Sequence, residues 1–261
     1  MRRDVRGNRI AMIFQEPMRS LSPLHRIGNQ VVEVIHLHRN TSETDAKREV
    51  LECFERVGFA DPERTWRSYP FELSGGMRQR AMIAMAMVAK PDLLIADEPT
   101  TALDVTTQAQ VLGLMKDLQQ ETGMAMILVT HDLGVVANMA EQVVVMHKGR
   151  VMEAGPAEPI LRAPAHPYTK DLFNAAPKIP EAICPLRDPQ EDLILELRNV
   201  TKTFTMRSGK NWSKPALVRA CEDVDLSLPR GKTLAIVGES GSGKTTAARI
   251  ALGAETVDAG G

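Results

Sequence analysis

The feature that most constrains this chain is a glycine-rich loop, Gly238–Thr246, with the sequence Gly-Glu-Ser-Gly-Ser-Gly-Lys-Thr-Thr. The loop fits the pattern G-x-x-x-x-G-K-[ST] of a phosphate-binding P-loop. The apolar run before it, Thr233–Val237, predicts a buried strand, and Thr246–Leu252 predicts the start of a helix. Strand, glycine loop and helix in this order are the context in which the pattern binds phosphate. The loop therefore favours a nucleotide-binding α/β fold.

The loop residues have separate expected roles. Glycines without a Cβ let the backbone turn tightly and direct several N–H groups inward, and the following helix start adds partial positive charge. Lys244 is expected to reach the terminal phosphates, and the Thr245 hydroxyl is expected to ligate Mg²⁺. The expected nucleotide contacts are Gly238, Glu239, Ser240, Gly241, Ser242, Gly243, Lys244, Thr245 and Thr246.

Composition excludes several classes of protein. The net charge of −1 over 261 residues gives no general attraction to nucleic acid. Cys53, Cys184 and Cys221 are scattered, which argues against a disulfide framework or a zinc site and suits a reducing cytosol. No apolar run approaches the roughly 18 residues that span a bilayer. A role at a membrane would therefore depend on a partner.

Apolar runs alternate with helical patterns in the first part of the chain. Three runs predict buried strands, Arg9–Phe14, Leu93–Ala96 and Ala125–Thr130. Strands of this kind that alternate with helices are typical of a parallel sheet. The expected helices are Ile27–Leu37, one from Thr41 or Ser42 to Val57, Met77–Ala89, Val105–Glu121 (capped by Asp104 and ended by Gly123) and Leu133–Ala140.

The remaining segments are expected to be less regular. Trp66–Pro70 is predicted as a loop, and Gln142–His147 with Arg150–Glu153 as a hairpin. Residues 155–190 carry eight prolines and predict an extended connector with one helical stretch, Tyr168–Ala176. Beyond it, the segments Leu193–Val200 and Leu217–Leu228 are predicted to be β-rich.

Two further stretches carry chemistry. Leu93–Ala96 is followed by Asp97 and Glu98. Asp97 suits an Mg²⁺ site and Glu98 suits the polarisation of an attacking water, the groups that phosphoryl transfer requires. Ser74, Gly75 and Gly76 supply a hydroxyl and two N–H groups at a helix start, a second anion-binding nest. Alone, the acid pair is equally well explained as a capped strand end.

With these residues the chain resembles the ATP-binding cassette (ABC) ATPases. Leu73-Ser74-Gly75-Gly76-Met77 looks like their signature sequence, with Met77 in place of the usual Gln. The resemblance continues in the order of the family: Gln15 matches the Q-loop, Asp97-Glu98 the Walker B acids, Ala102-Leu103-Asp104 the D-loop and His131 the switch histidine. It implies an α/β P-loop NTPase fold with a RecA-like parallel sheet and a helical subdomain, which binds ATP with Mg²⁺.

The resemblance also implies residue roles. Glu98, His131 and Gln15 would act in catalysis, and Gln15 would sense Mg²⁺ and face the membrane partner. Phe204 lies where an aromatic ring stacks on adenine, although a core phenylalanine explains it equally well. The nucleotide would also contact Ser74, Gly75, Gly76 and Asp104, and Mg²⁺ would be held by Thr245, Gln15 and Asp97.

Two segments look like the oligopeptide/dipeptide importers of the family, Gln15–Leu24 and His166-Pro167-Tyr168-Thr169. This branch implies an ATPase subunit that drives import of peptides or related solutes. Its implied partners are transmembrane permease subunits, a second ABC cassette and, indirectly, a solute-binding protein. Its implied location is peripheral, on the cytoplasmic face of the inner membrane.

The order of the motifs predicts two incomplete cassettes. Residues 1–155 match the later two-thirds of one cassette, 156–192 form a linker, and 193–261 match the β-rich first third of a second cassette. In one arrangement Gly238–Thr246 faces Ser74–Gly76 in a sandwich of two cassettes. In the other, the two pieces form one permuted cassette, with Lys244 close to Asp97. The functional alternatives are a non-hydrolytic nucleotide-binding fragment and an ABC ATPase without a transport role.

Overall fold

The computed structural model describes residues 2–16, 20–101, 103–175, 192–206, 216–239 and 241–261, and the chain divides into two units, Met1–Lys178 and Ile179–Gly261. A parallel sheet lies at the centre of the first unit, in the order β1 (Ile10–Ile13), β2 (Leu93–Asp97), β3 (Ala125–Val129). The predicted parallel α/β sheet is therefore confirmed.

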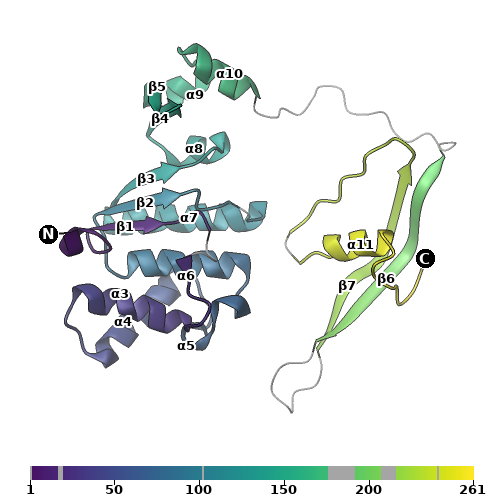
Figure 1. Ribbon diagram of the computed structural model, residues 1–261, viewed down its shortest axis with the longest axis horizontal. Coiled ribbons are helices and arrows are strands. Elements are labelled where there is room, and N and C mark those ends of the chain that lie inside the picture. Colours follow the sequence, from purple (N-terminus) through teal and green to yellow (C-terminus); the bar gives the residue numbers. More distant parts are fainter. Residues whose placement is uncertain (1, 17–19, 102, 176–191, 207–215, 240) are drawn as a thin grey trace. The chain divides into compact units, whose positions relative to one another are not determined.

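The two faces of this sheet differ. Side chains of alternate residues point to a buried face, where they join one hydrophobic core with helices α6 (Gly75–Met87) and α7 (Val105–Thr122). Figure 1 shows these two helices on the same side of the strands. The intervening residues Met12, Ile127 and Val129 point the other way and are 40%, 50% and 47% exposed.

Local signals set the starts of α4 (Glu43–Arg56) and α7, whereas α6, predicted as Met77–Ala89, begins and ends two residues earlier. Asp104 accepts a hydrogen bond from the amide of Thr107 at the start of α7, and Gly123 ends the helix with φ at 68°. Ser42 likewise accepts a hydrogen bond from the amide of Asp45 at the start of α4. These caps satisfy amide groups that have no partner inside the helix, and glycine accepts the left-handed conformation without strain.

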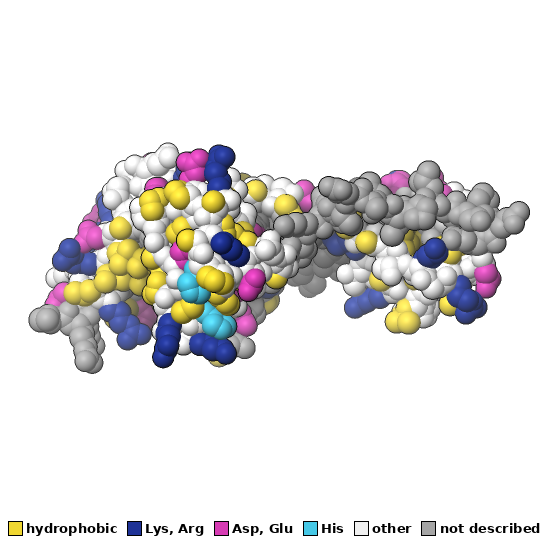
Figure 2. Space-filling model, turned by 90° about the horizontal axis from the view of Figure 1, so that it is seen from above, with side chains coloured by type: hydrophobic (Ala, Val, Ile, Leu, Met, Phe, Trp, Pro, Cys, Tyr) yellow, Lys and Arg dark blue, Asp and Glu magenta, His cyan; other side chains and the backbone are white. Residues whose placement is uncertain are grey.

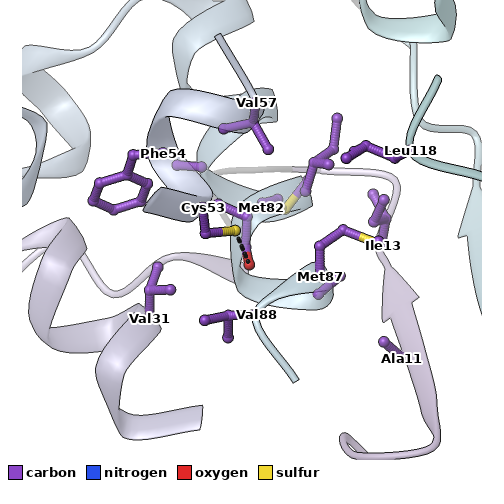
Figure 3. Packing of buried hydrophobic residues seen from close by; sticks show 14 of the residues in the cluster. Ala11, Ile13, Val31, Cys53, Phe54, Val57, Met82, Met87, Val88 and Leu118 are labelled. Atoms are coloured by element: carbon purple, nitrogen blue, oxygen red, sulfur yellow. Dashed lines mark hydrogen bonds between the residues drawn. The ribbon is translucent and has the colours of Figure 1, made fainter. Parts of the chain in front are cut away.

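A helical layer packs against α6. It consists of α3 (Ile27–His38), α4 (Glu43–Arg56), α5 (Pro62–Arg67) and a short 3-10 turn, Pro70–Glu72. Phe54 of α4 is fully buried, and the Cys53 thiol of the same helix approaches the carbonyl of Ala84 in α6 at 3.6 Å (Figure 3). The predicted loop Trp66–Pro70 is wrong at its start, because Asp61 caps a helix whose first residue is Pro62.

The rest of the first unit surrounds a β-hairpin. Strands β4 (Gln142–His147) and β5 (Arg150–Pro156) pair antiparallel, as predicted. Helices α9 (Ala157–Arg162) and α10 (Pro167–Ala175) pack on this hairpin, and α8 (Leu133–Met139) lies beside α9. The short helix α1 (Arg2–Val5) precedes β1. Helix α9 replaces the first part of the predicted extended connector. Its prolines did not prevent it, because Pro156 lies before the helix and Pro159 in its first turn, where no amide donor is required.

The second unit contains a long antiparallel hairpin. Strands β6 (Leu193–Met206) and β7 (Ala216–Pro229) pair with each other, and helix α11 (Lys244–Ala251) packs on them through Ala247 and Ile250. The described part of the chain contains no helix long and apolar enough to cross a bilayer.

The predicted strand Thr233–Val237 is wrong. The segment has no strand structure, and Leu234, Ile236 and Val237 are 42%, 41% and 87% exposed. A strand requires a neighbour that satisfies its backbone groups. In the described part of this unit the sheet consists of β6 and β7, and they pair with each other.

Candidate active site

A hydrogen-bonded cluster surrounds the carboxylate of Glu98. The Nε2 of Gln15 donates to Glu98 Oε2 at 2.6 Å, and the Oγ1 of Thr101 donates to the same oxygen at 2.9 Å. The Nδ1 of His131 lies 3.0 Å from Glu98 Oε1. Gln15 and His131, both predicted to act in catalysis, therefore each contact the third such residue, Glu98.

The parallel sheet explains this convergence. Gln15 follows β1, Glu98 follows β2 and His131 follows β3, so all three lie at the carboxyl ends of adjacent strands. Ligands of open α/β sheets bind at this edge. Glu98 has a φ of 45°, which is uncommon for a residue with a side chain, and its amide donates to the carbonyl of Val129.

The environment of Glu98 favours its charged form. Hydrogen bonds from His131, Thr101 and Gln15 hold the pKa of the Glu98 carboxyl below its ordinary value. The carboxylate is thus ionised at neutral pH and can accept a hydrogen bond from water. Asp97 is the last residue of β2 and lies opposite Val129 of β3.

The signature turn packs against the start of α7. Ser74 caps α6 by accepting a hydrogen bond from the amide of Met77 at 3.3 Å. A Cβ at Gly76 would lie 2.6 Å from the Cγ2 of Thr107, whereas one at Gly75 would meet its nearest neighbour at 3.8 Å. The Asp104 carboxylate accepts hydrogen bonds from both the amide and the hydroxyl of Thr107. Glycine at position 76 therefore allows a close approach between the two predicted nucleotide-binding segments.

The glycine loop belongs to the second unit. Gly243 has φ at 90°, and a Cβ there would overlap the carbonyl oxygen of Ala220, so this position requires glycine. The Nζ of Lys244 donates to the carbonyls of Gly238 and Glu239 at 2.7 Å and 2.6 Å and to the Ser242 hydroxyl at 3.3 Å.

The loop continues into α11, whose first turn contains Lys244, Thr245 and Thr246, with Thr245 exposed. Ser240, which was predicted to contact nucleotide, lies outside the described residues. The glycine-rich turn is thus hydrogen-bonded to the ammonium group of Lys244 at the start of α11.

Phe204 lies on β6 and is 37% exposed. The Nζ of Lys202 lies 5.4 Å from the centroid of the Phe204 ring. Lys202 also pairs with Glu255 at 3.1 Å and with Asp258 at 3.5 Å. This lysine was not predicted as a site residue; its position two residues before Phe204 on the same strand was the available signal.

Thr101 was also missed. It carries a hydroxyl three residues after Glu98, in the turn that leads to Asp104, and that spacing was the available signal. The predicted proximity of Lys244 to Asp97, like the predicted sandwich of Ser74–Gly76 with the glycine loop, stays a prediction.

The residues fit an Mg²⁺ ion that is held mainly by a nucleotide. The described part of the chain has no group of three or more His, Cys, Asp or Glu side chains arranged to hold a metal. Mg²⁺ at phosphate-transfer sites uses one or two protein ligands together with phosphate oxygens. The exposed hydroxyl of Thr245 and the carboxylate of Asp97 are donors of that kind.

Comparison with known proteins identifies the family of the chain. The family model described as "ABC transporter" matches residues 1–101 and 221–261. The chain belongs to the ABC transporter family. A second model, described as "Oligopeptide/dipeptide transporter, C-terminal region", matches residues 152–205. That match includes the His-Pro-Tyr-Thr segment, whose last three residues begin helix α10.

Curated relatives of this ABC protein include two named import or transport components. The chain is 46% identical to "Peptidoglycan transport ATP-binding protein YejF" of Agrobacterium fabrum, over 94% of its own length and 44% of that protein. It is 44% identical to "Glutathione import ATP-binding protein GsiA" of Escherichia coli, over 96% of its length and 44% of that protein. The chain therefore spans less than half the length of these relatives.

Solved structures confirm the fold. A dimeric bacterial ABC transporter cassette, MJ0796, matches with a TM-score of 0.51 and 31% identity, over 58% of this chain and 64% of that one. The cassette cbiO1 from Clostridium perfringens matches with a TM-score of 0.53 and 28% identity, over 59% of this chain and 60% of that one. The predicted ABC ATPase fold is thus confirmed.

Proposed function

We propose that this chain is part of an ATP-hydrolysing subunit of an ABC importer for peptides or related solutes. The contact of Gln15, Thr101 and His131 with Glu98 carries the proposal. A carboxylate held at the carboxyl edge of a parallel sheet, between an amide and an imidazole, suits the orientation of a water for attack on phosphate. The family membership and the names of the relatives agree with this activity.

The residues of the chain have distinct roles in this function. Glu98 orients and polarises the attacking water, and His131 donates a hydrogen bond towards the terminal phosphate. Lys244 and the loop amides bind phosphate oxygens, so Lys244 exchanges its present carbonyl acceptors for phosphate. Phe204 stacks on the adenine. Bound Mg²⁺, held by Thr245, Gln15 and Asp97, would neutralise charge that develops on the phosphates.

The partners follow from the family. In a sandwich of two cassettes, the nucleotide bound by the P-loop of one cassette would contact the residues Ser74, Gly75, Gly76 and Asp104 of the other, and permease subunits would contact the Gln15 loop. A solute-binding protein would act through the permease, and nucleic acid is not an expected partner. The expected location is peripheral, on the cytoplasmic face of the inner membrane. Residues 1–155, 156–192 and 193–261 would represent parts of two cassettes and their linker.

Two variants of the chain test this function. Lys244→Ala is expected to abolish ATP binding measured by calorimetry, whereas the exposed Lys116→Ala on α7 leaves binding unchanged. Glu98→Gln is expected to keep ATP binding and abolish steady-state phosphate release. Unchanged affinity in the lysine variant, or undiminished turnover in the glutamine variant, would contradict these roles.

A second candidate is nucleotide binding without turnover. It is favoured by one observation: the glycine loop lies in the Ile179–Gly261 unit, and Glu98 lies in the Met1–Lys178 unit. ATP binding that depends on Lys244, together with no phosphate release in the unmodified chain, would support this candidate over the ATPase.

A further inference from the structure

Lys202 of β6 is a buried lysine in the second unit. Its side chain is 9% exposed, whereas other Lys and Arg side chains stand at the surface of this unit in Figure 2. A lysine is rarely buried unless its charge is paired, because the ammonium group loses its hydration when it leaves water. The surroundings of Lys202 must therefore supply partners for the charge.

The loop that follows α11 supplies these partners. The Nζ of Lys202 lies 3.1 Å from Glu255 Oε1 and 3.5 Å from Asp258 Oδ1. It also donates a hydrogen bond to the Thr256 hydroxyl at 3.3 Å. The second carboxylate oxygen of Asp258 accepts a hydrogen bond from the amide of Thr203 at 2.7 Å. Asp258 thus holds both the side chain of Lys202 and the backbone of the next residue.

These contacts keep the Lys202 ammonium charged and in place. The hydrogen bond to Glu255 and the charges of Asp258 and Glu255 raise the pKa of Lys202 above its ordinary value. The hydrogen bond from the Thr203 amide and the charge of Lys202 lower the pKa of the Asp258 carboxyl. Because Lys202 and Asp258 are both ionised at neutral pH, a positive charge is fixed at this point of β6.

The fixed charge lies beside the ring of Phe204. The distance of 5.4 Å from the Nζ of Lys202 to the ring centroid is within the range of cation–π contacts. The pairing of β6 with β7 shifts register between Lys202 and Thr203, and irregularities of this kind re-aim neighbouring side chains. Phe204 is 37% exposed, so part of its side chain is accessible to a ligand.

We propose that Lys202 is a positioning residue for nucleotide binding, which holds the Phe204 ring in the orientation that stacks on adenine. This role rests on the function proposed above, in which Phe204 contacts the base. A ring that is already held in its binding orientation loses less rotational freedom on binding, so the affinity for the base rises. The Lys202 ammonium lies over one face of the ring and leaves the opposite face for the adenine.

Calorimetry with two ligands tests this role in the full 261-residue chain. ATP carries both adenine and phosphates, whereas inorganic triphosphate carries the phosphates alone. Lys202→Met removes the charge and is expected to weaken ATP binding roughly 2- to 10-fold, with triphosphate binding unchanged. Lys202→Arg should keep most of the ATP affinity, because a guanidinium also pairs with carboxylates and lies over aromatic rings. Lys232→Met, exposed in the same unit, is the matched control.

A double-mutant cycle shows whether Lys202 acts through Phe204. Phe204→Ala is expected to weaken ATP binding roughly 5- to 150-fold, the range of base stacking on an aromatic ring. Adding Lys202→Met to Phe204→Ala should cause no further loss, because the ring that the lysine holds is absent. A further loss in the double variant would overturn the proposal, as would equal weakening of ATP and triphosphate binding by Lys202→Met alone.

The same measurements separate this role from the proposed function. Weaker ATP binding in Phe204→Ala, with unchanged binding in Lys202→Met, would refute the role of Lys202 and keep that of Phe204. Unchanged ATP binding in Phe204→Ala would refute both roles, and an unmodified chain that binds neither ligand would contradict the proposed function as well. NMR of ring-labelled phenylalanine without nucleotide gives a readout independent of ATP. The Phe204 signals should shift in Lys202→Met, and unshifted signals would overturn the proposal.

Discussion

The two glycines that begin α6 are predicted to respond oppositely to alanine. At Gly76 a Cβ would lie 2.6 Å from the Cγ2 of Thr107, about 1 Å inside an ordinary carbon–carbon contact. At Gly75 the nearest atom, the Cδ2 of Leu103, lies at 3.8 Å, an ordinary contact. Both substitutions gain helix propensity, worth at most about 1 kcal/mol. The difference between the two positions is therefore steric.

The magnitude at Gly76 depends on how the overlap is relieved. Rotation of the Thr107 side chain would move Cγ2 away but would break the 2.9 Å bond from its hydroxyl to Asp104. A hydrogen bond to a charged group contributes about 1.5–3 kcal/mol. After the propensity gain, Gly76→Ala is expected to lower the free energy of unfolding by about 1–2 kcal/mol. Gly75→Ala should leave it unchanged or raise it by up to about 1 kcal/mol.

Urea denaturation followed by circular dichroism measures these differences. The double variant Gly76→Ala with Thr107→Ser removes Cγ2 and keeps the hydroxyl, so it should restore about 1 kcal/mol or more relative to the sum of the single changes. Equal stability of the Gly75 and Gly76 variants would refute the steric argument. If the two changes in the free energy of unfolding simply add in the double variant, the Thr107 side chain does not cause the steric overlap.

Three further outcomes are expected. Thr101→Val should raise the pKa of Glu98 towards its ordinary value, whereas Thr101→Ser should not, as measured by carboxyl NMR titration. Because the pKa of Glu98 is lowered in the folded state, the hydrogen bonds to its carboxylate stabilise the fold at neutral pH. This stabilisation is lost as the pH falls below the ordinary pKa of glutamate. The Thr101→Val variant lacks one of these bonds and should therefore lose less stability over that range of pH. Burial raises the pKa of the Cys53 thiol to about 11, so peptide mapping should find it alkylated by iodoacetamide at pH 8 in urea but not in the folded chain. Gly243→Ala should destabilise the second unit more than Gly241→Ala in thermal denaturation. Both glycines have a positive φ that strains alanine, but only at Gly243 would the added Cβ also overlap a backbone atom.

Much of the local structure could be predicted from the sequence. The cap at Asp104 and the stop at Gly123 placed α7 to within one residue, because both act through a few neighbouring backbone groups. The order of the motifs led to the ABC family by resemblance, and the family model matches. The resemblance also implied that Gln15, Glu98 and His131 act in catalysis, and the structure brings them together because parallel strands end at one edge.

Long-range structure decided the rest. Thr233–Val237 has the composition of a buried strand, yet it forms none in the described structure, because a strand exists only where a neighbour pairs with it. The contacts of Thr101 with Glu98 and of Lys202 with Phe204 were not predicted, and the fold creates both. The sequence by itself determined where α4 and α7 begin, since a cap depends on adjacent residues, but it did not predict α5 or α9. Tertiary structure decided which strands pair and which side chains meet Glu98, since both depend on residues distant in the chain.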